Sequence, residues 1–286
     1  MFHSGDRRRT PLEWGHPSRS SPGSHTMQPA GQSLHARDTT ATVVEHHRLR
    51  HDVAVVRLEA DTMVPFAPGQ YVDVTVPQHP RLPRRLSPAL PPSLDGKLEF
   101  HVRTVPGGWV SGTIVAGTRP GDVWTIGAPQ GGTLHVDDSG RIVIMVAGGT
   151  GLAPLRALIL DVARRPDPPQ TFLFVGGRSP RDLYAADMLI LLAEALPWLT
   201  VVPVVESVED PEFGDEWYER IVAHVGDAGF HPDDLLEGSL DEVVTSYGAF
   251  GDHQVLVCGS AAMVRATLHE LTGTGTPAGN IRFDPY

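Results

Sequence analysis

Two glycine-rich segments of the chain have the composition of loops that hold phosphate groups. The first reads GGTGLAP over residues 148–154 and comes directly after the apolar run 142–147. A strand that leads into a glycine loop and then a helix presents backbone N–H groups at the helix N-terminus, where a diphosphate binds. Glycine allows this approach because it has no Cβ. The spacing differs from the usual G-x-G-x-x-G pattern, so a tight turn without a ligand is an alternative for this loop alone.

The second segment reads CGSAAM over residues 258–263 and follows the short apolar run 254–258. In an open α/β sheet, ligands bind at the carboxyl ends of the strands. Both glycine segments are therefore expected to open on the same rim of one sheet. The alternative is structural, with Cys258 as a small buried residue and Ser260 as a helix N-cap.

Three further positions carry groups that bind anions. Arg178 lies just past the run 171–175, where it can contact an adenosine ribose or a 2′-phosphate. Residues 84–87 (RRLS) could grip a phosphate and a ring nitrogen through Arg84 and Ser87. Residues 107–111 (GGWVS) precede a helical segment and form another candidate diphosphate cradle. The alternatives are a solvated arginine, an ordinary basic loop, and a hairpin turn with Ser111 as the cap.

Metal and thiol chemistry find little support in the composition. The single cysteine, Cys258, excludes intrachain disulfides and an iron–sulfur cluster held by four thiolates of this chain. The 14 histidines show no H-E-x-x-H or H-x-x-E-H pattern, and the adjacent His46 and His47 would point apart on a strand. We therefore expect no metal site. One cysteine also favours a reducing compartment, so a cytoplasmic location is predicted.

The net charge of the chain limits the classes of molecule that it is expected to bind. Lys and Arg number 23, and Asp and Glu number 34, which gives a net charge of −11. An acidic surface repels phosphate backbones and anionic lipid, so no nucleic-acid partner is expected. No apolar run approaches the roughly 18 residues of a membrane-spanning helix. With 41% hydrophobic residues, the chain can build a sizeable core.

Three regions of the chain differ in composition and in the pattern of their apolar residues. Residues 1–38 are rich in Ser, Pro, Gly, His and Arg and are predicted to be a disordered tail, with a start at Met27 as one alternative. Residues 39–138 contain short alternating runs at 54–58, 71–76, 97–103 and 122–126, which predict an antiparallel barrel or sandwich. One helical pattern interrupts them at 110–116.

Residues 139–286 alternate between strands and helices. Strands are predicted at 142–147, 171–175, 200–205 and 254–258, and helices at 155–162, 180–196 and 260–271. This order predicts a doubly wound parallel sheet. Pro203 within its strand indicates an edge position or a bulge. The acidic and aromatic segment 209–237 is long for a loop in such a fold and is expected to form a short helix or a cover.

Taken in order, these motifs resemble the ferredoxin–NADP reductase superfamily over about residues 39–286. The motifs are residues 84–87, 107–111, 127–131, 148–154 and 258–263. The resemblance implies a Greek-key barrel that holds FAD in residues 39–138 and an NAD(P)H-binding α/β domain in residues 139–286. The reductase portions of flavohaemoglobins and oxygenase reductases are the most similar in pattern, without a globin or a cysteine-rich ferredoxin domain in this sequence.

The resemblance also implies site residues. FAD would contact Arg84, Leu86, Ser87, His101, Val102, Arg103, Gly108, Trp109, Val110 and Ser111. NAD(P)H would contact Gly148, Gly149, Thr150, Gly151, Pro154, Cys258, Gly259 and Met263. Arg178 is added to the nucleotide site because it lies just past the run 171–175. The residues expected closest to the reaction are Ser87 beside flavin N5, Cys258 beside the nicotinamide, Asp284 in place of the usual Glu, and Tyr286 near the flavin ring.

One position departs from the family pattern. Leu86 stands where the family usually has Tyr or Phe stacked on the flavin, and losing such a stack costs on the order of 1 kcal/mol. FAD is therefore expected to bind more weakly here. The implied activity is hydride transfer from NAD(P)H to FAD, followed by electron transfer to a separate acceptor protein. A reductase of free flavin or ferric iron, and a non-catalytic regulatory subunit, are the alternatives.

Overall fold

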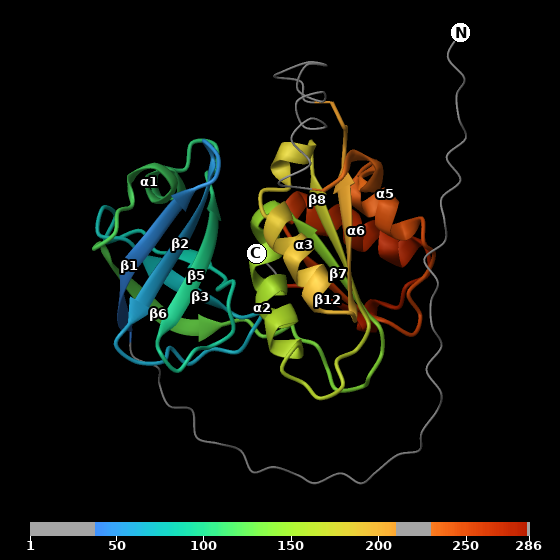
Figure 1. The fold of residues 1–286 in the computed structure, drawn as a ribbon, viewed down its shortest axis with the longest axis horizontal. Coiled ribbons are helices and arrows are strands. Elements are labelled where there is room, and N and C mark those ends of the chain that lie inside the picture. Colours follow the sequence, from blue (N-terminus) through green and yellow to red (C-terminus); the bar gives the residue numbers. More distant parts are fainter. Residues whose placement is uncertain (1–37, 210–229, 285–286) are drawn as a thin grey trace. The chain divides into compact units, whose positions relative to one another are not determined.

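The computed structural model describes residues 38–209 and 230–284. The first sheet has six antiparallel strands: β1 (Thr39–Arg48), β2 (Val53–Ala60), β3 (Tyr71–Thr75), β4 (Arg84–Leu86), β5 (Lys97–Arg103) and β6 (Val123–Gln130). Their order in the sheet is β4-β3-β6-β1-β2-β5, and they curl into a nearly closed barrel (Figure 1). The predicted antiparallel barrel is thereby confirmed.

The barrel closes where its two outer strands approach each other. Pro88, just after β4, forms an isolated bridge with Phe100 of β5, and the amide of Ala89 donates to the carbonyl of Glu99 at 2.7 Å. Inward side chains alternate along β5 as the sequence predicts, with Leu98, Phe100 and Val102 all in the barrel core. The helix α1 (Trp109–Gly117) packs against β5 and β2.

The second sheet is parallel and contains β7 (Val143–Gly148), β8 (Thr171–Gly177), β9 (Leu199–Val205), β10 (Leu236–Glu237), β11 (Gln254–Cys258) and β12 (Ile281–Arg282). The order is β10-β9-β8-β7-β11-β12. Residues 143–147 of β7 are buried on both faces, which explains their unbroken apolar sequence.

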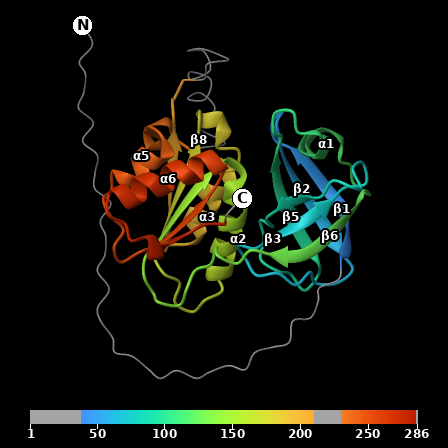
Figure 2. The same cartoon turned by 180° about the vertical axis from the view of Figure 1, so that it is seen from behind.

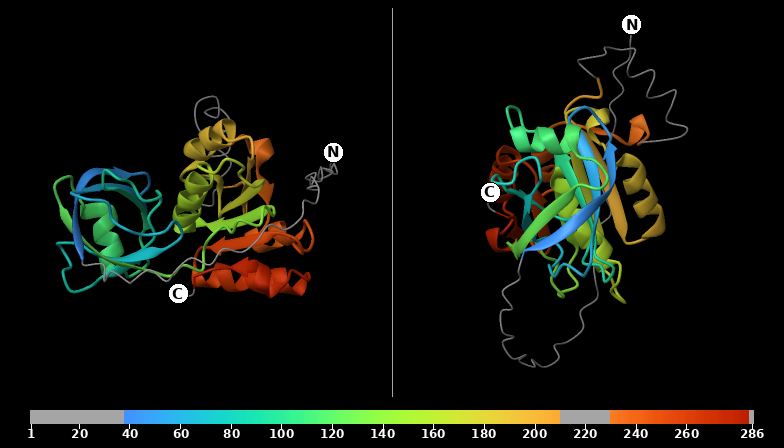
Figure 3. Two further views of the ribbon diagram at one scale, coloured as in Figure 1. Left: turned by 90° about the horizontal axis from the view of Figure 1, so that it is seen from below. Right: turned by 90° about the vertical axis from the view of Figure 1, so that its left-hand side faces the viewer.

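Helices cover both faces of this sheet. They are α2 (Leu152–Val162), α3 (Ala186–Ala195), α5 (Leu240–Thr245) and α6 (Ala261–Gly273). Figure 2 shows α5 and α6 together on one face, and the left view of Figure 3 shows α3 and α6 on opposite sides. The doubly wound sheet predicted from the sequence is confirmed. The strand order reverses at β7, so the carboxyl ends of β7 and β11 border the crevice where such sheets bind ligands.

The structure corrects the sequence analysis in two places. The helix expected at 180–196 is wrong in its first part, since a 3-10 turn (Pro180–Asp182) is followed by non-helical residues and α3 begins only at Ala186. Residues 84–86, for which an ordinary basic loop was the alternative, form the short strand β4. Pro203 lies in the ladder with β8 opposite Val175. β9 is the second strand of the sheet, but β10 pairs with it only at Val204 and Val205, so among the described strands Pro203 has a neighbour on one side alone.

Some expectations concern parts outside the described residues. The predicted tail and most of the segment 209–237 fall there, as does Tyr286. The domain limits 38/39 and 138/139 stay predictions. Within residues 38–209 and 230–284, no helix is long and apolar enough to cross a bilayer.

Candidate functional site

Two neighbouring cavities collect most of the residues that the sequence singles out. We call the first, of about 290 Å³, the arginine cavity, because Arg84, Arg85 and Arg103 line it. We call the second, of about 180 Å³, the loop cavity, because Thr150 and Gly151 of the glycine loop line it. Arg85, Leu86, His101 and Thr150 border both. The two together reach the size of small-molecule pockets, roughly 300–1,000 Å³.

The arginine cavity is built for an anion. Among the described residues that line it, three are arginines and none is acidic, although the chain carries a net charge of −11. Arg84 donates from Nη1 to the carbonyl of Pro83 at 2.8 Å, and its side chain is otherwise exposed. Val102 and His101 complete the wall from β5.

The N-terminus of α1 adds donors to the same cavity. Gly108 is the N-cap, with no side chain to satisfy the first N–H groups of the helix. Ser111 lines the cavity, but its Oγ accepts from the amide of Val105 at 3.0 Å, so it also closes the local turn. The side chain of Val110 is in the barrel core and Trp109 is 76% exposed, and neither of these two predicted residues lines the cavity.

Arg103 connects the arginine cavity to the second sheet. Its Nη2 donates to Asp182 Oδ1 at 3.2 Å, and its Nε lies 3.5 Å from Asp52 Oδ2. Its Nη1 would lie 3.7 Å from a Cβ placed on Gly149, so the guanidinium is next to the glycine loop. Asp182 also pairs with Arg50. Burial raises the pKa of Asp182, but Arg50, Arg103 and the amide of Arg178 outweigh it, so the pKa is lowered and the carboxylate is ionised.

The glycine loop packs directly against the end of β11. A Cβ on Gly151 would lie 2.3 Å from the carbonyl oxygen of Cys258, so no other residue fits there without moving backbone. Gly148 and Gly259 face the side chain of Met263, whose Cε would be 2.6 Å and 2.3 Å from their respective Cβ atoms. Ser260 caps α6 by accepting from the amide of Met263, as the structural alternative expected.

The loop cavity brings residues from opposite ends of the chain together. Ser87 comes from the barrel, Cys258 and Gly259 from the end of β11, and Pro154 from α2. Asp284, from the last described residues, lines the same cavity. Among the described residues, its Oδ1 is buried without a hydrogen-bond partner, and burial raises the pKa of this carboxyl despite three backbone donors.

Tyr71 is a residue that the sequence analysis missed. Its ring lines the loop cavity, and the guanidinium of Arg85 lies over it at 5.4 Å from the centroid. Leu86 pairs with the next residue, Val72, across the β3–β4 ladder. The aromatic surface that Leu86 does not provide is therefore present on the neighbouring strand. Tyr71 could not be assigned to the site from the sequence, because only the pairing of β3 with β4 places it near Leu86.

Two predicted residues have a different setting from the rest. The ring of His101 is buried, with Nε2 3.0 Å from Glu99 Oε1 and Nδ1 2.7 Å from the Tyr184 hydroxyl. Burial lowers the pKa of His101, so the ring is neutral. Arg178 is exposed at the end of β8 and lines neither cavity.

These features fit a flavin dinucleotide and a nicotinamide dinucleotide. Three guanidinium groups and an uncapped helix N-terminus suit a diphosphate. The loop cavity offers an aromatic ring, a hydroxyl and an orphaned carboxylate oxygen, which suit a polar heterocycle. The glycine loop and the end of β11 also line this cavity, through Thr150, Gly151, Cys258 and Gly259.

Two family models match this chain. The model described as an oxidoreductase FAD-binding domain matches residues 40–135, and the one described as an oxidoreductase NAD-binding domain matches residues 145–269. The first match contains the arginine-bearing wall, and the second contains the glycine loop and residues 258–263. The division agrees with the two sheets of the structure.

Similar proteins carry the same combination. The chain is 31% identical over 245 residues to the xylene/toluene monooxygenase electron transfer component of Pseudomonas putida, covering 86% of this chain and 64% of that protein. It is 32% identical over 251 residues to reductase component 2 of a Comamonas terephthalate 1,2-dioxygenase, covering 86% and 68%. The chain thus spans less than two thirds of the Pseudomonas relative.

A solved structure agrees with these relatives. The ferredoxin reductase in carbazole 1,9a-dioxygenase superposes with a TM-score of 0.70 at 26% identity, over 86% of this chain and 68% of that one. Fold, family models and relatives agree with the motif order, and the chain belongs to the ferredoxin–NADP reductase superfamily.

Proposed function

We propose that this protein is an FAD-dependent NAD(P)H oxidoreductase that passes electrons to a separate acceptor protein. The observation that carries the proposal is the pair of adjoining cavities between the region matched as FAD-binding and the region matched as NAD-binding. Leu86, His101 and Thr150 border both, so one bound molecule can extend from the diphosphate site into the loop cavity.

The barrel residues bind and orient the flavin. Arg84, Arg103 and the N-terminus of α1 hold the diphosphate in the arginine cavity. Tyr71 and Leu86 support the flavin ring system, and Ser87 donates its hydroxyl hydrogen toward the ring edge. When bound, the two cofactors supply hydride transfer from the nicotinamide to flavin N5 and the later release of electrons.

The second sheet positions the nicotinamide. Gly148, Gly149, Thr150 and Gly151 admit the nucleotide diphosphate close to the backbone, with Pro154 in the first turn of α2. Cys258 and Gly259 form the wall that orients the nicotinamide, and Met263 fills the space between the two glycine segments. Asp284 places a carboxyl group in the loop cavity, where it can accept a hydrogen bond.

The test is optical and needs only purified protein. We expect the protein to be yellow, or to become yellow on addition of FAD, and its flavin absorbance to bleach anaerobically with NADH or NADPH. A protein that binds flavin but is reduced by neither nucleotide would contradict the oxidoreductase proposal and favour a regulatory subunit.

The acceptor is proposed from the relatives. Their printed names describe electron transfer or reductase components of monooxygenases and dioxygenases. We propose an oxygenase, a haem protein or an iron–sulfur protein as the acceptor of this chain, and a cytoplasmic location, which the single cysteine supports. Reduction of such a protein by NAD(P)H only in the presence of this chain is the expected result.

Leu86→Tyr is expected to strengthen FAD binding by roughly fivefold, since an added aromatic stack contributes on the order of 1 kcal/mol. Leu86 borders both cavities, so the new ring would reach the flavin. The dissociation constant follows from flavin fluorescence during titration of the flavin-free protein. Leu86→Met, which keeps the size without a ring, is the control and should leave the constant close to that of the natural protein.

Arg178→Ala is expected to raise KM for the preferred nucleotide by about tenfold, because a hydrogen bond to a charged group contributes about 1.5–3 kcal/mol. Arg178 lines neither cavity, so kcat should stay the same. Steady-state kinetics with NADH and with NADPH measure both constants. If neither KM changes, Arg178 does not contact the nucleotide.

A further inference from the structure

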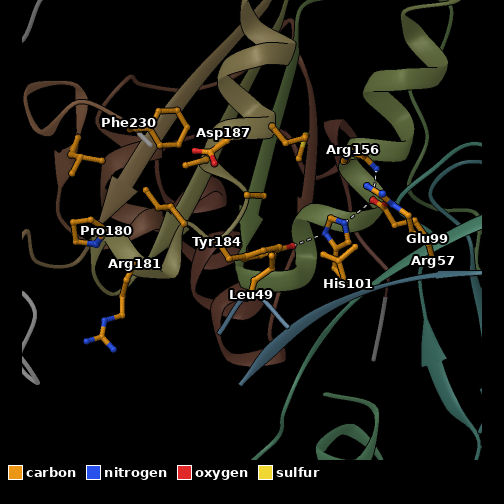
Figure 4. Close-up of a pocket in the computed structure, with 16 residues that line it drawn as sticks. Leu49, Arg57, Glu99, His101, Arg156, Pro180, Arg181, Tyr184, Asp187 and Phe230 are labelled. Carbon is orange, nitrogen blue, oxygen red and sulfur yellow. Dashed lines mark hydrogen bonds and ion pairs between the residues drawn. The ribbon is translucent and has the colours of Figure 1, made fainter. Parts of the chain in front are cut away.

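A buried carboxylate joins three elements beside the cofactor cavities. The side chain of Glu99, on β5, is 4% exposed. Its Oε2 accepts from Arg57 Nε of β2 at 2.8 Å, and its Oε1 accepts from Arg156 Nη1 of α2 at 2.8 Å and from His101 Nε2 at 3.0 Å. Figure 4 shows these side chains at one end of a third cavity, of about 420 Å³.

The carboxylate is ionised at neutral pH. Burial raises its pKa, but His101, Arg156 and Arg57 outweigh this and lower the pKa to about 2. Two arginines, of which Arg156 is largely buried and Arg57 is half exposed, and one neutral imidazole therefore face a full negative charge. Charge-assisted hydrogen bonds of this kind are short and strong, and they fix the side chains that make them.

Arg156 is the member that ties α2 to the barrel. Its Nη1 donates both to Glu99 Oε1 and to the carbonyl of Ala89, each at 2.8 Å. Ala89 lies two residues after Ser87, and α2 starts at Leu152, directly after the glycine loop. One guanidinium nitrogen thus connects the helix that carries the glycine loop to the backbone next to Ser87.

Tyr184 extends the connection to the segment before α3. Its hydroxyl donates to His101 Nδ1 at 2.7 Å, which leaves Nε2–H of the neutral ring to donate to Glu99. Burial raises the pKa of Tyr184, so the phenol keeps its proton. Figure 4 marks these contacts, which run from Tyr184 through His101 to Glu99, with dashed lines.

We infer that Arg156, held by Glu99, is a positioning residue that sets the separation between the glycine loop and Ser87, and thereby between the nicotinamide and the flavin. The inference rests on the proposed function and goes beyond it, since neither residue lines the arginine cavity or the loop cavity. Arg156 touches neither ring and acts through α2 and residues 87–89.

The physical reason is the steep dependence of hydride transfer on distance. Reacting atoms need to lie about 3–3.5 Å apart, and a misplacement of about 1 Å costs on the order of 100-fold in rate. The backbone hydrogen bonds of a helix keep its residues at fixed spacing. A shift at Arg156, about one turn into α2, would therefore displace the start of the helix and the glycine loop before it. Binding of each cofactor alone does not require the two walls to keep this spacing.

The experiment compares two arginines that share the same carboxylate. Arg156→Gln removes the link between α2 and the barrel, whereas Arg57→Gln removes a donor within the barrel, outside both cofactor cavities. In FAD-loaded protein at saturating nucleotide, we expect anaerobic stopped-flow flavin reduction to slow by about 10- to 100-fold in Arg156→Gln. Arg57→Gln should stay within about twofold, and Arg156→Lys, which keeps the positive charge on a single donor nitrogen, should recover part of the rate.

Two readouts separate positioning from plain stability. The dissociation constant for FAD should stay within about twofold in Arg156→Gln, while the long-wavelength charge-transfer absorbance with a redox-inert tetrahydro analogue of the nucleotide should weaken. In flavin-free protein, amide hydrogen exchange should rise at residues 149–155 in Arg156→Gln and not in Arg57→Gln.

The outcomes also separate this inference from the proposed function. If the natural protein is never reduced by NADH or NADPH, the proposed function is wrong. If the natural protein is reduced and Arg156→Gln is reduced at the same rate with an unchanged charge-transfer band, the function stands and the positioning role is overturned. A lower unfolding temperature with an unchanged rate would likewise overturn it.

Discussion

Replacing Gly151 by alanine is expected to lower the rate of nucleotide-dependent flavin reduction by about 100-fold or more, while FAD binding is retained. The new Cβ would lie 2.3 Å from the carbonyl oxygen of Cys258, 2.4 Å from its carbonyl carbon and 2.6 Å from the nitrogen of Gly259. All three are backbone atoms, so the glycine loop and the end of β11 have to move apart. Both segments line the loop cavity opposite Ser87, and their separation disturbs the nicotinamide site.

The measurement is anaerobic flavin reduction at several nucleotide concentrations, with FAD content determined from absorbance. Gly273→Ala is the matched control, because it lies in the same sheet domain at the end of α6 and its Cβ would meet nothing within 4 Å. The control should reduce flavin at the natural rate. A Gly151→Ala protein with normal kinetics would show that the glycine loop does not bind the nucleotide.

Removing the charge of Glu99 is expected to destabilise the protein by about 3 kcal/mol at pH 7 and to flatten its acid denaturation. The pKa of Glu99 falls from 4.5 to about 2 in the folded protein, and each pKa unit corresponds to about 1.4 kcal/mol. Because the folded pKa is lower than the unfolded one, this stabilisation is present above pH 4.5. It is lost as the pH falls from 4.5 toward 2.

The measurement is the free energy of unfolding against pH for the natural protein and for Glu99→Gln, from denaturant titrations in the flavin-free form. The two curves should differ most near neutral pH and approach each other in acid. Asp95→Asn is the control, since its pKa is also lowered to about 2, by Lys97 and Ser93, but the pair is more than half exposed. Solvent screens an exposed pair, so this change should be nearly neutral.

The architecture followed from the sequence because its signals are local. Residues 143–147 read as one apolar run because neighbours cover both faces of β7, and the alternation of Leu98, Phe100 and Val102 marks the inner face of the barrel. The glycine loop of the site could also be predicted from the sequence, because a glycine-rich segment between a strand and a helix places backbone N–H groups where a phosphate can bind.

The missed features depend on contacts between distant residues. The outward positions Glu99 and His101 are buried because α2 and Tyr184 cover that side of the barrel, and their partners lie 57 and 83 residues away. The same contact explains the late start of α3. The backbone leaves the helical region at Leu183, with ψ of 58°, and the next residue, Tyr184, meets His101. The apolar pattern of residues 180–196 cannot predict this hydrogen bond, because its partner lies 83 residues away in the sequence.

The arginine cavity lies where the two outer strands of the barrel approach each other. The outer strands β4 and β5 are joined by a single bridge at Pro88 and Phe100, and beyond it both strands line the cavity, through residues 84–86 and 101–103. A dinucleotide bound there would lie across the line along which β4 and β5 are not paired with each other. The contacts to such a molecule would come from both outer strands of the barrel, so the diphosphate site depends on how closely β4 and β5 approach each other.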